Sequence, residues 1–211
     1  MTNFATRDEV IRLRDAVSKL SQPGRSGGVR NIERKSKAIS AFVNSEKVLK
    51  LVASHIGGKP ILARAIYFNK TADQNWLVAW HQDKTTAVSK KLENSDWLNW
   101  TLKDGVNHAQ PPMEVFSKML TLRLHLDSTD QSNGCLKVIP RSHLLGVLPQ
   151  AKVLAYSGQE LSSYCEANAG DALLMHPLLI HASSKAPIPT ARRIIHMEYC
   201  SYELPESAEW V

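Results

Sequence analysis

The sequence predicts a mainly β fold, a β-barrel or jelly roll flanked by α-helices. Two observations carry this prediction. Helix signals are confined to residues 1–58, whereas residues 59–204 contain short runs of β-branched and aromatic residues separated by turn residues. Helices in front of many consecutive strands are typical of a sheet or barrel that helices cover from outside.

The N-terminal part is expected to contain two helices. Thr6 and Glu9 have the T-x-x-E spacing of a capping box, ahead of apolar residues at helical spacing, Val10, Leu13, Val17 and Leu20. Ser45 can cap the helix "EKVLKLVASHI", which Gly57 and Gly58 end. Strands are then expected at "ILARAIYF", "WLVAW", "MLTLRLHLD", "GCLKVIP", "ALLM" and "RRIIHMEYCSY".

Length and composition indicate one domain, residues 1–211, because 43% of the residues are hydrophobic and can form a sizeable core. The first ten residues contain no apolar leader segment, and no run of about 18 apolar residues occurs. We therefore expect a cytoplasmic protein without a membrane partner. The three cysteines never form a C-x-x-C pair, which argues against disulfides and a zinc ribbon.

The formal net charge of +6 is concentrated in two runs, "RSGGVRNIERKSK" and "KTTAVSKK". Such runs can attract an anionic partner, but no aromatic residues are interleaved with the first of them. A solvated surface is therefore the favoured interpretation, and nucleic acid is not an expected partner.

A candidate metal site follows the apolar run "NWLVAW". His81 and Asp83 are two residues apart, so on a strand their side chains point to one face and can bind one ion. Two imidazoles and one carboxylate on one face of iron leave the opposite positions open for a co-substrate and O2. The second imidazole has to come from a distant strand, and "HPLLIHASSKAPIPTARR" offers His176 and His181.

The order of these motifs resembles the phytanoyl-CoA dioxygenase family of iron(II)- and 2-oxoglutarate-dependent oxygenases. The resemblance runs from "RAIYFNKT" to "RRIIHMEY" and rests on "WHQD", "LHLDSTDQSNGCLKVIPRSHLLG" and "GDALLMHPLLIHASS". Arg141 stands where the family usually has glycine. The resemblance implies a double-stranded β-helix (jelly roll, cupin-like) that uses iron(II), the co-substrate 2-oxoglutarate, O2 and a small-molecule substrate.

Carried over residue by residue, the resemblance makes His81, Asp83 and His181 the metal ligands and the catalytic centre. It makes Arg192 the partner of the distal carboxylate of 2-oxoglutarate. The family's arginine lies eleven residues after its distal histidine, and Arg192 lies eleven residues after His181 but sixteen after His176.

Two further contacts with 2-oxoglutarate are implied. Ser183 would add a hydroxyl to the distal carboxylate, and Tyr67 is the candidate polar side chain of the early strand. Arg193 is expected to face the other side of its strand from Arg192.

A second H-x-D pair, His125 and Asp127, competes with the first. It lies 56 residues before His181, a separation common in other branches of the 2-oxoglutarate oxygenases. However, "RLHLDSTDQSNGCL" matches the family's strand and hairpin downstream of the ligands, and "HQDKTT" leads into a long polar segment. We therefore predict that His81 and Asp83 bind the metal and that His125 is a polar residue on a leucine-rich strand.

Residues 84–118 are predicted to form a lid that selects the substrate, because the segment is too long for a hairpin. The candidate substrate contacts in it are Trp97, Trp100, His108 and Gln110. An equally weighted alternative is a helix and loop whose tryptophans only cap the barrel.

The sequence thus predicts a dioxygenase that hydroxylates a small or medium organic substrate and releases succinate and CO2. Asp83 favours hydroxylation, because halogenating relatives have Ala or Gly at this position. Two alternatives stay open. A non-catalytic cupin-like protein that binds a metal or small molecule would not need Arg192, and an oxygenase acting on alkylated nucleic acid would use the basic N-terminal segment.

Overall fold

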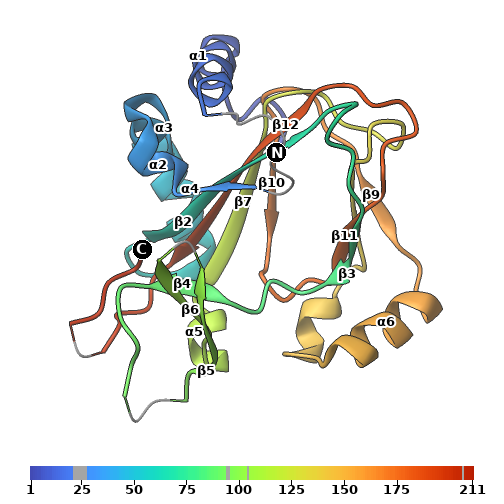
Figure 1. The fold of residues 1–211 in the computed structure, drawn as a ribbon. Coiled ribbons are helices and arrows are strands. Elements are labelled where there is room, and N and C mark those ends of the chain that lie inside the picture. The colour runs from blue at the N-terminus through green and yellow to red at the C-terminus, as the bar shows by residue number, and fades with distance from the viewer. Residues whose placement is uncertain (21–27, 94–95, 104, 206) are drawn as a thin grey trace.

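The structure, a computed structural model, describes residues 1–20, 28–93, 96–103, 105–205 and 207–211. Two β-sheets face each other with helices outside, which confirms the predicted mainly β fold with flanking helices (Figure 1). The first sheet has the order β1 (Val29–Arg30), β2 (Ile61–Lys70), β12 (Arg192–Cys200), β7 (Met119–His125) and β10 (Ala172–Met175). The second has the order β3 (Val78–His81), β11 (His181–Ser183), β8 (Leu136–Val138) and β9 (Ser163–Cys165).

Four N-terminal helices cover the outer face of the first sheet: α1 (Arg7–Ser18), α2 (Ile32–Lys35), α3 (Lys37–Val43) and α4 (Glu46–Ile56) (Figure 1). The predicted capping box is present, because Thr6 Oγ1 accepts from the Glu9 N–H at 3.3 Å and the Glu9 carboxylate accepts from the Thr6 N–H at 2.8 Å. α4 begins directly after Ser45, as predicted, but the Ser45 hydroxyl forms no capping hydrogen bond with the described residues. The N-terminal part is not wholly helical, because β1 pairs with β2.

Alternation along the central strands separates a core face from an inner face. On β7, Leu122 packs into the main core beneath the helices, whereas the neighbouring Arg123 points between the two sheets. On β12, Met197 joins the same core and His196 faces inward. Fully burying a leucine or methionine contributes about 1.5 to 3 kcal/mol, so the outer face holds the helices to the sheet. The inner face is left for polar side chains.

The segment 84–118, predicted to be a lid, instead carries a small third sheet with the order β4 (Thr86–Val88), β6 (Val106–Gln110) and β5 (Leu98–Lys103), followed by α5 (Met113–Phe116). Trp97 is buried, and its ring centroid lies 6.2 Å from that of Trp100 and 6.1 Å from that of Trp210. These rings pack with Val115 and Phe116 in a separate apolar cluster. Trp97 and Trp100 therefore pack as the alternative expected, but the segment contains a sheet rather than a helix and loop.

The connection after β7 brings a backbone carbonyl close to the second sheet. Gly134 has a φ of 76°, and a Cβ there would come within 2.7 Å of the Ser184 carbonyl oxygen, so only glycine fits. Beyond β8, Arg141 has a φ of 66°, in the left-handed region that favours glycine. This conformation accounts for the glycine that the resembled family usually has there. A 3-10 helix, η1 (Ser142–Leu145), and α6 (Gln150–Gln159) follow.

All three cysteines are free thiols, and Cys135 and Cys200 are buried. Among the described residues, no helix combines the length and the apolar character needed to cross a bilayer.

Candidate metal centre and pocket

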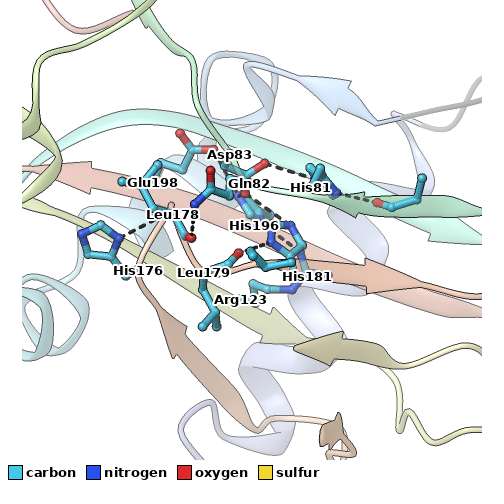
Figure 2. A network of polar contacts seen from close by, with 12 residues as sticks. His81, Gln82, Asp83, Arg123, His176, Leu178, Leu179, His181, His196 and Glu198 are labelled. Carbon is cyan, nitrogen blue, oxygen red and sulfur yellow. Dashed lines mark hydrogen bonds and ion pairs between the residues drawn. The ribbon is translucent and has the colours of Figure 1, made fainter. Parts of the chain in front are cut away.

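Two neighbouring strands of the second sheet bring the predicted metal ligands together. β3 and β11 are antiparallel, and His81 lies directly opposite His181 in their register. Asp83 follows the end of β3, where its backbone N–H donates to the Pro177 carbonyl at 2.9 Å. Figure 2 shows the three side chains close together in the space between the sheets.

The side chains of His81, Asp83 and His181, the metal-binding set, are oriented as the ligands of one ion would be. Nε2 of His81 and Nε2 of His181 lie 3.6 Å from different oxygens of Asp83. Nδ1 of each histidine lies 2.8 Å from the carbonyl oxygen two residues earlier, that of Ala79 or Leu179. A carbonyl only accepts, so Nδ1 carries the proton of each neutral ring and the Nε2 lone pair is free. One ligand atom from each side chain lies within 4.8 Å of the others.

Charge coupling keeps these groups in forms that bind a cation. Burial acts to raise the pKa of Asp83, but His181, His81 and His196 hold it well below its usual range. Burial lowers the pKa of His181 to about 4. Burial also acts to lower the pKa of His81, but the hydrogen bond and charge of Asp83 outweigh it and raise that pKa. At neutral pH, Asp83 is therefore ionised and His181 is neutral, as metal ligation requires.

The competing H-x-D pair has other partners. The Asp127 carboxylate accepts from Nε and Nη2 of Arg193, both at 2.7 Å, and lies 3.0 Å from Arg14. His125 is buried, and neither of its ring nitrogens has a hydrogen-bond partner in the described part of the chain. Asp127 belongs to no cluster of three metal-ligating side chains among the residues described. His176 accepts at Nδ1 from the Leu178 N–H at 3.1 Å, within a turn.

His125 leads to a prediction about acid stability. Burial lowers its pKa to about 3, below the ordinary value of 6.5 that it regains on unfolding. Because the folded pKa is the lower one, its contribution to stability is present above pH 6.5 and is lost as the pH falls toward 3. We expect His125→Leu to lose less free energy of unfolding than the wild type between about pH 7 and about pH 4, measured by urea denaturation. Equal losses of free energy of unfolding in the two proteins would contradict the lowered pKa of His125.

A pair of buried cations lies beside Ser183. Arg192 Nη1 donates to the Gly134 carbonyl at 2.5 Å and lies 3.4 Å from Ser183 Oγ. Lys70 Nζ donates to Ser183 Oγ at 2.8 Å and to the Ser184 carbonyl at 2.6 Å. Neither cation forms an ion pair with any carboxylate that the structure describes. Two buried cations with neutral partners have the charge and the hydrogen-bond donors that would suit an anion.

On the early strand, Lys70 rather than Tyr67 lies beside Ser183. Tyr67 points to the other face of β2 and packs in the main core beneath the helices, so its assignment to 2-oxoglutarate is wrong. Lys70, three residues later, reaches Ser183 from the inner face. The alternation within "YFNK" was the available signal, because it places Phe68 and Lys70 on one face. Burial, and then the charge of Arg192, lower the pKa of Lys70 to about 8.

A pocket of about 160 Å³ joins the metal-binding set to Arg192. Its apolar wall consists of Ile66, Phe68, Trp76, Val78 and Leu136. The described residues that line it include none of the four predicted substrate contacts, Trp97, Trp100, His108 and Gln110. His108 is buried on β6, and Gln110 accepts at Oε1 from Asn99 at 3.2 Å. The four predicted substrate contacts therefore lie away from this pocket.

Four further polar side chains line the pocket and form one hydrogen-bonded set, the charged network (Arg64, Arg123, His196 and Glu198). Arg123 Nη1 lies 2.8 Å from His196 Nδ1, and His196 Nε2 lies 3.1 Å from Glu198 Oε1 (Figure 2). Arg64 Nη2 lies 2.7 Å from the same oxygen. An arginine only donates, so His196 accepts at Nδ1 and carries its proton on Nε2.

Sequence reasoning missed the charged network. The polar positions that alternate with apolar ones in "RLHLD" and "RRIIHMEY" were the available signal.

A second set of possible ligands, Asp83, His196 and Glu198, also lies within 4.8 Å. There the lone pair of His196 Nδ1 accepts from Arg123, and Glu198 is paired with Arg64. A metal at this set would lie beside two guanidinium groups. The set of His81, Asp83 and His181 is therefore the better candidate for a metal site.

A model of the phytanoyl-CoA dioxygenase (PhyH) family matches residues 3–186. No curated protein matched the sequence. Similar solved structures include AviO1 from Streptomyces viridochromogenes Tue57, with a TM-score of 0.67 and 20% identity over 97% of this chain and 89% of that chain. HygX from Streptomyces hygroscopicus with nickel and 2-oxoglutarate bound has a TM-score of 0.67 and 16% identity over 95% and 81%. EctD from S. alaskensis with bound Fe has a TM-score of 0.72 and 16% identity over 95% and 71%.

These structural likenesses show a shared fold, since the identities are 20% or lower. The family model adds a match in sequence that spans most of the chain and includes the metal-binding set. The chain therefore belongs to the phytanoyl-CoA dioxygenase family.

Proposed function

We propose that this protein is an iron(II)- and 2-oxoglutarate-dependent dioxygenase that hydroxylates a small or medium organic substrate and releases succinate and CO2. One observation carries the proposal: two free imidazole nitrogens and a carboxylate converge in the same pocket as a buried arginine. Membership of the family supports it, and so do the solved structures of HygX with nickel and 2-oxoglutarate and of EctD with Fe.

The residues fit an iron(II) ion by their donor chemistry. Asp83 Oδ2 is buried and has no hydrogen-bond partner among the described residues, which leaves an anionic acceptor for a cation. The carbonyls of Ala79 and Leu179 hold the protons on Nδ1, so His81 and His181 keep their Nε2 lone pairs available. Two imidazoles and one carboxylate suit the non-haem iron of oxygenases.

Arg192, Lys70 and Ser183 would hold the distal carboxylate of 2-oxoglutarate. Arginine and lysine each donate charge-assisted hydrogen bonds, and the hydroxyl of Ser183 lies within 3.4 Å of both cationic groups. The two cations now donate to the carbonyls of Gly134 and Ser184, and an incoming carboxylate would provide the missing negative charge. Lys70 thereby joins the two residues that the sequence assigned to this role.

When bound, iron(II) and 2-oxoglutarate supply the oxidation chemistry, and the protein positions and shields the reacting groups. Phe68, Trp76, Val78 and Leu136 form an apolar wall that limits the access of water. Asp83 would supply the carboxylate ligand of the metal, which halogenating relatives lack, so hydroxylation rather than halogenation is the expected reaction.

The proposal predicts iron-dependent formation of succinate. The protein incubated with iron(II), 2-oxoglutarate and O2 should form succinate, quantified by mass spectrometry, and the same protein with a chelator should not. The product of the primary substrate should gain one oxygen atom, which separates hydroxylation from the reactions named for the structurally similar SnoN, an epimerase, and SnoK, a carbocyclase. Binding of iron and 2-oxoglutarate without succinate under any condition would favour the non-catalytic alternative.

A further inference from the structure

Besides Arg192, a second buried arginine of the pocket forms no ion pair with a carboxylate that the structure describes. Arg123 is 6% exposed, and its Nη1 donates to a neutral acceptor, Nδ1 of His196. Its Nε has no hydrogen-bond partner among the described residues. By contrast, Arg64 lies 2.7 Å from Glu198 and Arg193 lies 2.7 Å from Asp127. Burying a guanidinium without an anion lowers the stability of the folded protein, and Arg123 is buried in this way at the pocket.

The charged network holds Arg123 in place. His196 presents its Nδ1 lone pair to Arg123 because its Nε2 proton is directed to Glu198, which Arg64 also binds. The Cζ atom of Arg123 also lies 5.9 Å from the centre of the Phe68 ring. The guanidinium is therefore fixed before any ligand arrives, which lowers the ordering cost of binding.

Arg123 lies apart from the cations assigned to the distal carboxylate of 2-oxoglutarate. In the first sheet, Arg192 is opposite Lys70, whereas Arg123 is opposite His196, four residues further along β12. Four strand residues span about 13 Å. His196 Nε2 is 4.0 Å from Asp83 Oδ2, so this part of the strand lies under the metal-binding set. An anion held by Arg123 would therefore lie near the metal.

We propose that Arg123 binds the acid group of the primary substrate, and that this substrate is a small organic acid; the inference rests on the proposed function. Ile66, Phe68 and Trp76 would contact its hydrocarbon part. The pocket volume of about 160 Å³ is below the range of about 300 to 1,000 Å³ typical of pockets for drug-sized ligands, and iron and 2-oxoglutarate would occupy part of it, so the acid is small. The C1 carboxylate of 2-oxoglutarate shares this chemistry and is the rival occupant.

The test compares acids with their amides, which have nearly the same shape without the charge. Protein loaded with nickel(II) and 2-oxoglutarate is titrated calorimetrically with phenylacetate, hexanoate and isovalerate and with the three matching amides. We expect the wild type to bind at least one acid about tenfold or more tightly than its amide. Arg123→Gln should lose this preference, and Arg123→Lys should keep part of it. Arg193→Gln, a matched control on the helix-covered face, should keep all of it.

The outcomes separate the two proposals. Equal binding of every acid and its amide by the wild type, including no binding at all, would overturn the organic-acid substrate. A loss of 2-oxoglutarate affinity in Arg123→Gln as large as that in Arg192→Ala would assign Arg123 to the co-substrate and also overturn it. Failure of the wild type to bind nickel or 2-oxoglutarate would instead overturn the proposed function. If circular dichroism shows that Arg123→Gln does not fold, an unchanged preference of Arg123→Lys for the acid over its amide counts against the proposal.

Discussion

Replacing His81 or His181 with alanine is expected to abolish stoichiometric iron(II) binding. Each residue supplies an Nε2 lone pair that a backbone hydrogen bond at Nδ1 has already oriented toward Asp83. Changes to such orienting groups alone typically cost about 10- to 100-fold in metal affinity, so loss of the ligand itself should cost at least about 100-fold. Iron content after anaerobic purification, measured by mass spectrometry, checks this expectation.

Two other histidines provide matched controls for this experiment. His125→Ala removes the imidazole of the competing H-x-D pair, and His176→Ala removes the other histidine of the "HPLLIH" segment. Both variants should keep the iron of the wild type, because neither side chain is part of the metal-binding set. Iron retained by His81→Ala and lost by His125→Ala would show that the competing pair binds the metal.

The parts of the fold and site that could be predicted are those encoded by local spacing. The capping box of Thr6 and Glu9 depends on residues three apart, and its hydrogen bonds are present. His81 and Asp83 converge because residues two apart share a face at the end of a strand. His181 was the one long-range choice, and the structure brings it opposite His81. The eleven-residue separation from Arg192, carried over from the resembled family, was needed to choose it over His176.

The parts that sequence reasoning missed depend on which face of a strand is covered by the second sheet. Tyr67 and Lys70 belong to one strand. If the inward-facing positions of that strand are assigned one residue off, a side chain of the core is mistaken for one of the pocket. Arg123 belongs to no local motif, because its partner His196 is 73 residues away in the sequence. The strands of 84–118 were missed for a related reason: β4, β5 and β6 are short, and the pairing among them defines them. The role of this segment as a lid stays a prediction.

Arg192→Ala is expected to weaken 2-oxoglutarate binding by about one to four decades while metal binding persists. Truncating one side of a buried charge pair typically costs about 2 to 5 kcal/mol, at about 1.4 kcal/mol per decade. Calorimetric titration of the nickel-loaded protein with 2-oxoglutarate measures the change. Arg193→Ala removes the same charge from the helix-covered face, where Asp127 binds it, and should leave the affinity unchanged. An unchanged affinity in Arg192→Ala would remove Arg192 from the site.

Lys70 makes the same affinity depend on pH. Its pKa is lowered to about 8, so as the pH rises through that value the free protein loses one of the two charges that attract the carboxylate. The affinity of the wild type for 2-oxoglutarate should therefore fall above pH 8, whereas Lys70→Arg should show a flatter profile because arginine stays protonated. Because Lys70 and Arg192 share Ser183, Lys70→Ala and Arg192→Ala should not be additive in a double-mutant cycle. Parallel pH profiles in the wild type and Lys70→Arg, together with strict additivity, would show that Lys70 supports the strand but does not contact the co-substrate.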